Sequence, residues 1–222
     1  VNASLTLDNS ANVLVTSIDG SAMTDTLTVT LANNAANATL TGGSGNDTLT
    51  ASAFEATIAG GDVLNGGAGN DTLISTTQIS TLTGGTGDDI FKIGLSAQLD
   101  KYAHITDALA GDRIEMWGHD ASAAVAMTSF ASSQTVLNDT ASFTEWADKA
   151  VVTATADGVD GAGAWFQYDG NTYIVLSGDD DAATTSFDIA TDSIVSLVGI
   201  HDLSTASYNS DIGGANEAYL QI

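Results

Sequence analysis

The sequence contains no cysteine and very few basic residues. Without cysteine, disulfide bonds and thiolate zinc sites are excluded, so stability has to come from packing or from a bound metal. Only 4 Lys and Arg residues oppose 28 Asp and Glu residues, which gives a formal net charge of −24. A chain of this charge repels nucleic acid and anionic membrane surfaces, and we expect neither as a partner. Cations are the expected partners.

Long apolar runs are also missing. No run reaches the roughly 18 residues that a membrane-spanning helix needs, so we expect no membrane insertion. The chain begins at Val1 without the basic and apolar segments of a signal peptide. This predicts either a fragment of a longer protein or export by another route.

Glutamate is scarce as well, because it occurs only at positions 55, 115, 145 and 217. The other acidic residues are aspartates, whose shorter carboxylate suits turns and calcium loops. This bias favours metal binding over helical salt bridges. For the aspartates outside the repeats described next, ordinary solvated surface acidity is the alternative interpretation.

Three glycine-rich segments align without gaps on a nine-residue pattern. They are GGSGNDTLT at 42–50, GGAGNDTLI at 66–74 and GGTGDDIFK at 84–92. All three fit G-G-x-G-x-D-x-U-x, in which U is a large apolar residue, and this is the calcium-binding RTX nonapeptide. The chain therefore resembles the RTX (repeats-in-toxin) family over about residues 24–92.

Each nonapeptide divides into a six-residue loop and a three-residue strand. Glycines permit the tight loop, and the central strand residue points into a core. Two nonapeptides then make one turn of a right-handed parallel β-roll, a β-solenoid with calcium loops. The upstream segments at 4–7, 12–15 and 26–31 are interpreted as degenerate coils or a β cap. Counting in nines predicts the apolar ladder Leu31, Leu40, Leu49, Leu64, Leu73, Leu82 and Phe91.

The spacing of the repeats predicts which loops stack. Gly66 and Gly84 are eighteen residues apart, and Gly42 and Gly66 are twenty-four apart, which is eighteen plus a six-residue insertion at 51–56. If one turn takes two nonapeptides, all three perfect loops lie on one edge of the roll. The degenerate loops starting at 33, 57 and 75 lie on the other edge, so calcium should line one side only.

The resemblance also implies the ligands, because each RTX ion lies between stacked loops and takes an aspartate and backbone carbonyls from each. It implies one ion between the loops of Asp47 and Asp71, and another between those of Asp71 and Asp89. Asp62 is a weaker candidate, since its loop lacks a good stacked partner. The alternative is a metal-free solenoid with ordinary turns. The implied carbonyl ligands belong to Gly42, Ser44, Gly67, Ala68, Gly69, Gly85 and Gly87.

The second half loses the glycine rhythm and predicts a β-rich domain with one helix. HITDALAGDRIEM at 104–116 resembles the segment that follows RTX repeats in type I secreted proteins, so Asp107 and Asp112 either hold a further ion or form a capped turn. We expect a helix from about Phe143, opened by a Ser142 or Thr144 cap. A hairpin at 164–177 turning at Asp169-Gly170 and a strand at 192–200 follow.

The sequence lacks the familiar catalytic motifs. The sequence has no HExxH zinc motif, no G-x-S-x-G elbow and no phosphate loop, so we expect no enzyme activity. An aromatic group in the hairpin could form a sugar-stacking patch, but a packed core is the favoured interpretation. Its members are Trp165, Phe166, Tyr168 and Tyr173.

These observations predict two domains, a β-roll at 1–99 and a β-rich C-terminal domain with a secretion signal at 100–222. The last sixty residues resemble the C-terminal region of RTX S-layer proteins. This implies a secreted, cell-surface structural protein that binds Ca²⁺, uses type I secretion machinery and self-associates into a lattice. The alternative is the secretion and folding module of an RTX adhesin, toxin or hydrolase whose active domain lies upstream.

Overall fold

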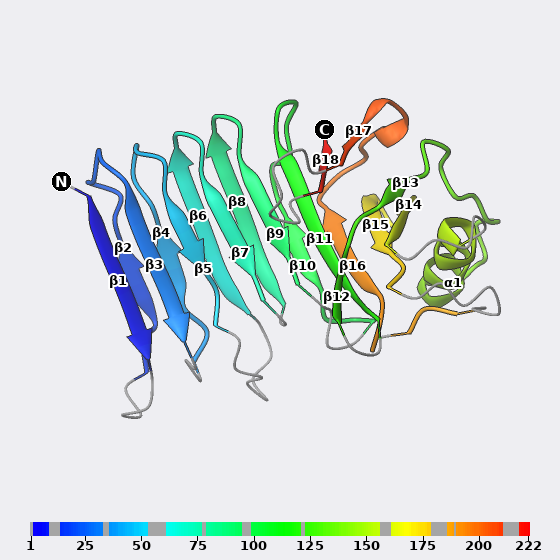
Figure 1. The fold of residues 1–222 in the computed structure, drawn as a ribbon, viewed down its shortest axis with the longest axis horizontal. Coiled ribbons are helices and arrows are strands. Elements are labelled where there is room, and N and C mark those ends of the chain that lie inside the picture. The colour runs from blue at the N-terminus through cyan, green and yellow to red at the C-terminus, as the bar shows by residue number, and fades with distance from the viewer. Residues whose placement is uncertain are drawn as a thin grey trace.

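The computed structural model describes residues 2–8, 14–32, 36–52, 61–76, 79–94, 99–120, 123–155, 161–178, 186–188, 190–210 and 218–222. In this part of the chain two nine-stranded sheets, mostly parallel, face each other (Figure 1). The predicted all-β class is confirmed, with one α-helix among the described residues.

Sheet I and sheet II are named here by their strand order. Sheet I runs β1 (Ala3–Asp8), β3 (Leu27–Ala32), β5 (Thr48–Thr50), β7 (Thr72–Ser75), β9 (Ile90–Ile93), β11 (Arg113–Asp120), β18 (Tyr219–Gln221) and β17 (Ser207–Asn209), with β12 (Ala123–Ala126) paired to β11. Sheet II runs β13 (Ser129–Phe130), β14 (Ala162–Tyr168), β15 (Asn171–Leu176), β16 (Ser193–Leu197), β10 (Ala103–Ile105), β8 (Ser80–Thr86), β6 (Asp62–Ala68), β4 (Thr39–Thr41) and β2 (Ser17–Asp19).

Up to β11 the chain alternates between the two sheets, odd-numbered strands in sheet I and even-numbered strands in sheet II. Every pair along this stretch is parallel and in register, so one side chain from each strand forms a continuous row inside. The inner row of sheet I is Val29, Leu49, Leu73, Phe91 and Ile114, and that of sheet II is Leu40, Leu64, Leu82, Ile105 and Leu197, all 0% exposed.

The predicted apolar ladder is confirmed from Leu40 to Phe91 and wrong at Leu31. Val29, not Leu31, pairs with Leu49. The backbone N–H of Leu27 reaches Asp47, 20 residues on, so this step is two residues longer than two nonapeptides. Counting in nines therefore misplaced the register, although Leu31 is still buried beside β1.

Upstream of the repeats, the predicted strands at 4–7 and 26–31 correspond to β1 and β3. The segment 12–15 is only partly described, and its residues 14–15 are not in a strand; β2 begins at Ser17 instead. Most of the insertion at 51–56 and the loop residues 57–60 also lie outside the described residues.

The C-terminal half extends both sheets at one end. β18 joins β11 antiparallel in sheet I, and β15 joins β16 antiparallel in sheet II. The hairpin β14–β15 turns at Asp169 and Gly170, whose φ angles are 46° and 79°. The expected hairpin and the strand β16 are confirmed, and a 3-10 helix, η3 (Leu203–Thr205), precedes β17.

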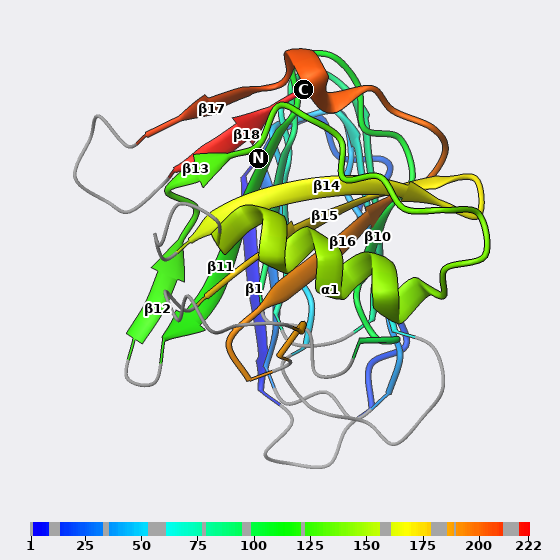
Figure 2. The ribbon, with the colours of Figure 1, turned by 90° about the vertical axis from the view of Figure 1, so that its right-hand side faces the viewer.

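The expected helix is α1 (Phe143–Ala154), and Ser142 is its N-cap. The Ser142 Oγ accepts the N–H of Glu145, and the Glu145 carboxylate accepts the N–H of Ser142, so both ends of a capping box are present. The helix crosses the outer side of β14 and β15 (Figure 2). No helix among the described residues is long and apolar enough to cross a membrane.

The predicted domain boundary near residue 99 falls between β9 and β10. Both sheets continue across it, because β10 pairs with β8 and β11 pairs with β9. The hydrophobic core likewise runs from Leu27 to Leu220 without interruption at this point.

Candidate calcium site

The three perfect loops, 42–47, 66–71 and 84–89, stack on one edge of the two sheets, which we call the aspartate edge. Gly67 pairs with Gly85 across the second and third loops. The N–H of Ala68 donates to the carbonyl of Gly43 at 3.0 Å, which joins the first and second loops. The stacking predicted from the repeat spacing is confirmed.

Glycine is required on this edge for two reasons. Gly67 and Gly85 have φ angles of 109° and 105°, in the region that side chains rarely adopt. A Cβ atom at Gly85 would also overlap the carbonyl oxygen of Gly67. The loops can therefore approach closely enough for their backbone oxygens to line the narrow gaps between them.

A ladder of buried aspartates runs along the inside of the aspartate edge. Asp47 accepts the backbone N–H of Leu27, and each later carboxylate accepts the backbone N–H of the preceding aspartate. The N···O distance is 2.7 Å from Asp47 to Asp71 and 2.8 Å from Asp71 to Asp89, and it is 2.9 Å from Asp89 to Asp112. All four side chains are buried. These hydrogen bonds between carboxylates and backbone N–H groups hold successive loops in register.

One oxygen of this ladder has no partner. Asp71 is 0% exposed, and its Oδ2 makes no hydrogen bond. Leaving a buried carboxylate oxygen unpaired is costly, so such an atom usually marks a bound group or strain. The same oxygen lies against Gly66, close to the carbonyl of Gly84 in the next loop. A carboxylate oxygen and a carbonyl oxygen therefore converge in the gap between the second and third loops.

The first gap has the same arrangement one loop earlier. The Oδ2 of Asp47 and the carbonyl oxygen of Gly66 both lie against Gly42. Here Asp47 Oδ2 also accepts the N–H of Gly43 at 2.6 Å. Carboxylate and carbonyl oxygens are the ligands that calcium prefers, at 2.3–2.6 Å and in numbers of six to eight. Both gaps therefore offer oxygen atoms of the kind that calcium prefers, but both oxygens of Asp47 already accept N–H groups, from Leu27 and Gly43, whereas Asp71 Oδ2 accepts none.

No protein-family model matches this chain, and no curated protein matches it either.

Without a metal, burial and neighbouring charges disfavour the ionised carboxylates of the aspartate ladder. Burial raises the pKa of Asp71 to about 7; the N–H of Asp47 partly offsets this, and the charges of Asp89 and Asp47 add to it. Burial likewise raises the pKa of Asp89 to about 6, with contributions from Asp112, Asp107 and Asp88. A cation in the gaps would reverse this, because it favours the ionised carboxylates.

Asp107 and Asp112 form a fourth stacked loop, which ends the aspartate edge. The carboxylate of Asp107 accepts the N–H groups of Gly84 and Gly85 at 2.9 and 2.8 Å. Asp112 accepts the N–H of Leu109 at 2.7 Å, in addition to that of Asp89. Both oxygens of each carboxylate accept N–H groups, as both oxygens of Asp47 do, so the hydrogen bonds show the capped turn and leave the further ion a prediction.

Asp62 lies on the opposite edge, where the repeat spacing had placed its loop. Its two oxygens accept the N–H groups of Ala38 and Ser52, each at 2.8 Å, and burial raises its pKa. The carboxylate therefore ties three neighbouring segments together without a metal. Asp62 thus has a structural role on the opposite edge and is not part of the aspartate ladder.

The residues predicted to supply carbonyl ligands all belong to the three stacked loops of the aspartate edge. Within the described residues no three acidic or histidine side chains converge on one point, so backbone carbonyls would have to complete any calcium site. Sequence reasoning missed Gly66 and Gly84, although both open a perfect repeat. It also missed a preceding loop at 20–26, against which Gly43 and Gly45 pack. The predicted carbonyls are those of Gly42, Ser44, Gly67, Ala68, Gly69, Gly85 and Gly87.

The raised pKa values predict how the metal-free protein responds to pH. Asp71 and Asp89 have folded-state pKa values of about 7 and about 6, above the ordinary value of 3.8. Their contribution to stability is full below pH 4 and is lost as the pH rises through 6 and 7. In calcium-free buffer, far-ultraviolet circular dichroism should therefore show a β signal that falls from pH 5 to pH 8, as the stacked loops lose stability. Asp71→Asn should flatten this slope, and an unchanged slope would contradict the assignment.

Proposed function

We propose that this chain is an extracellular calcium-binding structural protein, and that its two sheets form a right-handed parallel β-roll of the RTX type. Three perfect nonapeptides support the proposal, as does the stacking of their loops on one edge. The observation that carries it is the buried, unpartnered Oδ2 of Asp71, in the middle of the aspartate ladder. The role is structural and not catalytic.

Two ions are proposed, one in each gap of the aspartate edge. Asp47 and Asp71 would hold the first, and Asp71 and Asp89 the second, with carbonyls of the facing loops completing each shell. Calcium supplies positive charge to a column of buried carboxylates and coordinates the oxygens that face the gap. The fourth loop, with Asp107 and Asp112, is proposed as the end of the series.

The chain's own residues explain why binding would couple to folding. The ladder brings Asp71 within range of the charges of Asp47 and Asp89, which raise its pKa. At neutral pH the metal-free carboxylates repel each other, and their burial removes the water that would screen them. The calcium ligands come together only when the loops are stacked. The free energy of calcium binding would therefore stabilise the folded state. The protein would then be unfolded at low calcium and rigid outside the cell.

The proposed cellular role is that of an S-layer or other surface component, exported by type I secretion and assembled on calcium binding. The acidic, cysteine-free, threonine- and alanine-rich composition supports this class. Electron microscopy with and without millimolar calcium tests the assembly step. Ordered sheets or filaments only with calcium are expected, and a monodisperse monomer in both conditions would contradict lattice formation.

Replacing Asp71 tests the calcium proposal directly. Asp71→Asn removes a charge that both proposed sites share, so isothermal titration should show calcium affinity falling by about tenfold or more, since one charged ligand is worth roughly 1.5–3 kcal/mol. Asp47→Asn and Asp89→Asn should weaken binding less, because each serves one site.

Asp62→Asn is the matched control, because Asp62 is also a buried aspartate that accepts backbone N–H groups, but it lies on the other edge. Its calcium affinity should stay within about twofold of the original protein. Equal losses in the Asp62 and Asp71 variants would mean that the aspartates support the fold alone. The calcium sites would then have to be abandoned.

A further inference from the structure

The first strand of sheet I has one open edge. β1 pairs with β3 on one side, and no other strand among the described residues pairs with its second side. The N–H of Ala3 donates to the carbonyl of Thr26 on the β3 side. Backbone N–H and C=O groups of successive strand residues point to opposite sides, so those of Ser4 and Thr6 point to the open edge. β1 therefore offers hydrogen-bonding groups to one more strand.

The hydrophobic core is exposed at the same end. Leu5 stands in the inner row of sheet I, in register with Val29 and Leu49. Val29 and Leu49 are 0% exposed, whereas Leu5 is 40% exposed. The inner row of sheet II ends at Ile18 on β2, which is only partly buried and whose strand pairs with β4. In a stacked repeat fold each coil buries its apolar side against a neighbour, and the described part of this end lacks one.

The opposite end of the two sheets offers much shorter edges. Its outermost strands are β13 and β17, of 2 and 3 residues, and short edge strands discourage further pairing. The hairpin aromatics there, Trp165 and Phe166 among them, largely belong to the packed core, which confirms that interpretation over a sugar-stacking patch. Within the described chain, the β1 end alone combines an open strand of 6 residues with an exposed residue of the inner row.

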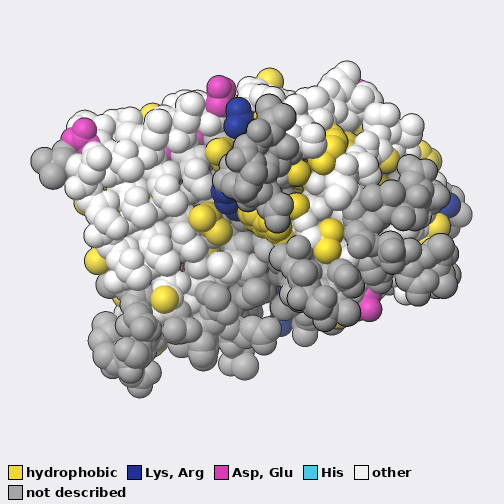
Figure 3. Space-filling view, in the orientation of Figure 1, with side chains coloured by type: hydrophobic (Ala, Val, Ile, Leu, Met, Phe, Trp, Pro, Cys, Tyr) yellow, Lys and Arg dark blue, Asp and Glu magenta, His cyan; other side chains and the backbone are white. Residues whose placement is uncertain are grey.

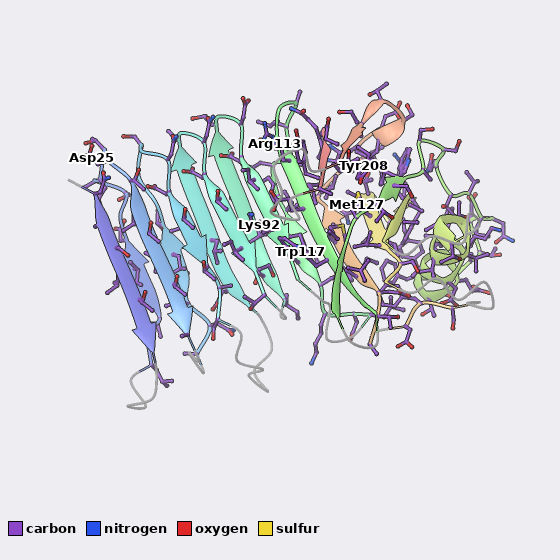
Figure 4. All side chains as sticks on the ribbon, in the orientation of Figure 1. Asp25, Lys92, Arg113, Trp117, Met127 and Tyr208 are labelled. Atoms are coloured by element: carbon purple, nitrogen blue, oxygen red, sulfur yellow. The ribbon has the colours of Figure 1, made fainter. Side chains whose placement is uncertain are left out.

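The open edge carries little charge for a protein of formal net charge −24. Residues 3–7 of β1 are uncharged, and β2 contains one acidic residue, Asp19. Figure 3 shows mainly white surface with some yellow at this left-hand end, and Figure 4 labels Asp25 at its upper corner. A second copy of the chain is equally acidic, so it can approach closely only where like charges do not meet. The edge of β1 is such a place.

We propose that the open edge of β1 pairs antiparallel with β1 of a second copy, about a two-fold axis at Leu5. In this register Ser4 lies opposite Thr6 of the partner copy, and Leu5 lies opposite its own counterpart. Because the backbone groups of Ser4 and Thr6 point to the open edge, these residues form the hydrogen-bonded pairs, and Leu5 forms the closer non-hydrogen-bonded pair. A shift by one residue would set Leu5 against Thr6 and mix core with surface. The contact is therefore self-complementary, as a two-fold interface requires.

The sequences of both edge strands fit this symmetric register. Asp8 would lie opposite Asn2 of the partner copy, so the register sets no aspartate of β1 directly against its counterpart. On sheet II, antiparallel pairing about Ile18 would place Ser17 opposite Asp19 of the partner copy, a hydroxyl group against a carboxylate. The inner rows of both sheets would then continue from one copy into the other. The second copy thus supplies the missing neighbour.

Sedimentation equilibrium at several protein concentrations in calcium buffer tests the proposal. The 22.4 kDa chain should form a dimer of twice that mass. Salt should strengthen the dimer, because it screens the repulsion between two acidic copies. Leu5→Glu should raise the dimer Kd by at least about tenfold, since it replaces an apolar cross-strand pair with two like charges. An equimolar mixture of Leu5→Glu and Leu5→Lys should dimerise again, because opposite charges then face each other.

Val63→Glu is the matched control, because Val63 is similarly exposed, at 38%, but lies on the outer face of β6. Its dimer Kd should stay within about twofold of the original value, as expected for a site outside the contact. Thr6→Pro removes an N–H from the open edge and none from the pairing with β3, so it should weaken the dimer while circular dichroism shows an unchanged fold.

A monomer at every concentration would refute the proposal and leave the open edge to a strand of another protein or of a longer chain. Equal weakening by Val63→Glu and Leu5→Glu would overturn it, as would failure of the two Leu5 variants to associate with each other. The inference does not rest on the proposed function, because a two-fold pair is closed and needs neither calcium nor a lattice. Calorimetric calcium titration of Leu5→Glu, which should match the original protein, distinguishes failure of the two proposals.

Discussion

Removing calcium is expected to unfold the stacked strands β3 to β9, whereas millimolar calcium restores them. Each proposed site stabilises the folded state by about 2.7 kcal/mol at a hundredfold excess of calcium over its Kd. Two sites together therefore approach the whole stability of an ordinary domain, roughly 5–15 kcal/mol. The buried carboxylates of Asp71 and Asp89 act in the opposite direction when no ion is present, because both have raised pKa values.

Far-ultraviolet circular dichroism during a calcium titration measures this transition, and urea unfolding at each calcium concentration gives the free energy. Magnesium at equal concentration is the control, because it holds its water and demands octahedral geometry, so it should restore far less structure. The packing of α1 on β14 and β15 forms a separate core that should respond less. Identical spectra and unfolding midpoints in calcium and in EDTA would contradict coupled folding.

The substitution Gly85→Ala is expected to disrupt the aspartate edge and to lower the free energy of unfolding by more than about 3 kcal/mol. Its methyl group would overlap the carbonyl oxygen of Gly67, and the φ angle of 105° adds backbone strain. Both effects push the third loop away from the second. Calcium affinity should fall with stability, because the gap that Asp71 faces would widen.

Gly170→Ala is the control for backbone strain alone. Gly170 has a φ angle of 79°, and no atom lies within 4 Å of a Cβ placed there. This variant should lose only about 1 kcal/mol, the cost of a side chain in a left-handed conformation, and should bind calcium normally. Thermal unfolding and calcium titration of both variants provide the comparison. If the two variants lose equal stability, then Gly85 is not required for the close stacking of the loops.

Local patterns made much of the fold predictable. The glycine and aspartate places of 42–47, 66–71 and 84–89 recur at fixed spacing, so their stacking on one edge followed from counting residues. The Ser142 cap and the Asp169-Gly170 turn were recognisable for the same reason, since each depends on a few adjacent residues. These features depend on short-range geometry that a residue pattern records directly.

The errors occurred where the length of a connection changed. The step from Leu27 to Asp47 spans 20 residues, and that from Asp89 to Asp112 spans 23. A periodic count cannot register such changes, so Leu31 was placed in a row that Val29 occupies. The sequence also contains no sign of which aspartate oxygens meet N–H donors, because that depends on the exact offset between facing loops.

The sequence by itself determined the repeat, the edge on which its aspartates lie, and the mostly β character of the chain. Only the tertiary structure decided that Asp107 and Asp112 have their oxygens filled by N–H donors while Asp71 Oδ2 remains unpartnered. It alone brought Tyr219 to Arg113, more than a hundred residues away in the chain. The physical reason is that a loop motif is local, whereas carboxylate partners and neighbours across a sheet depend on the register of strands distant in sequence.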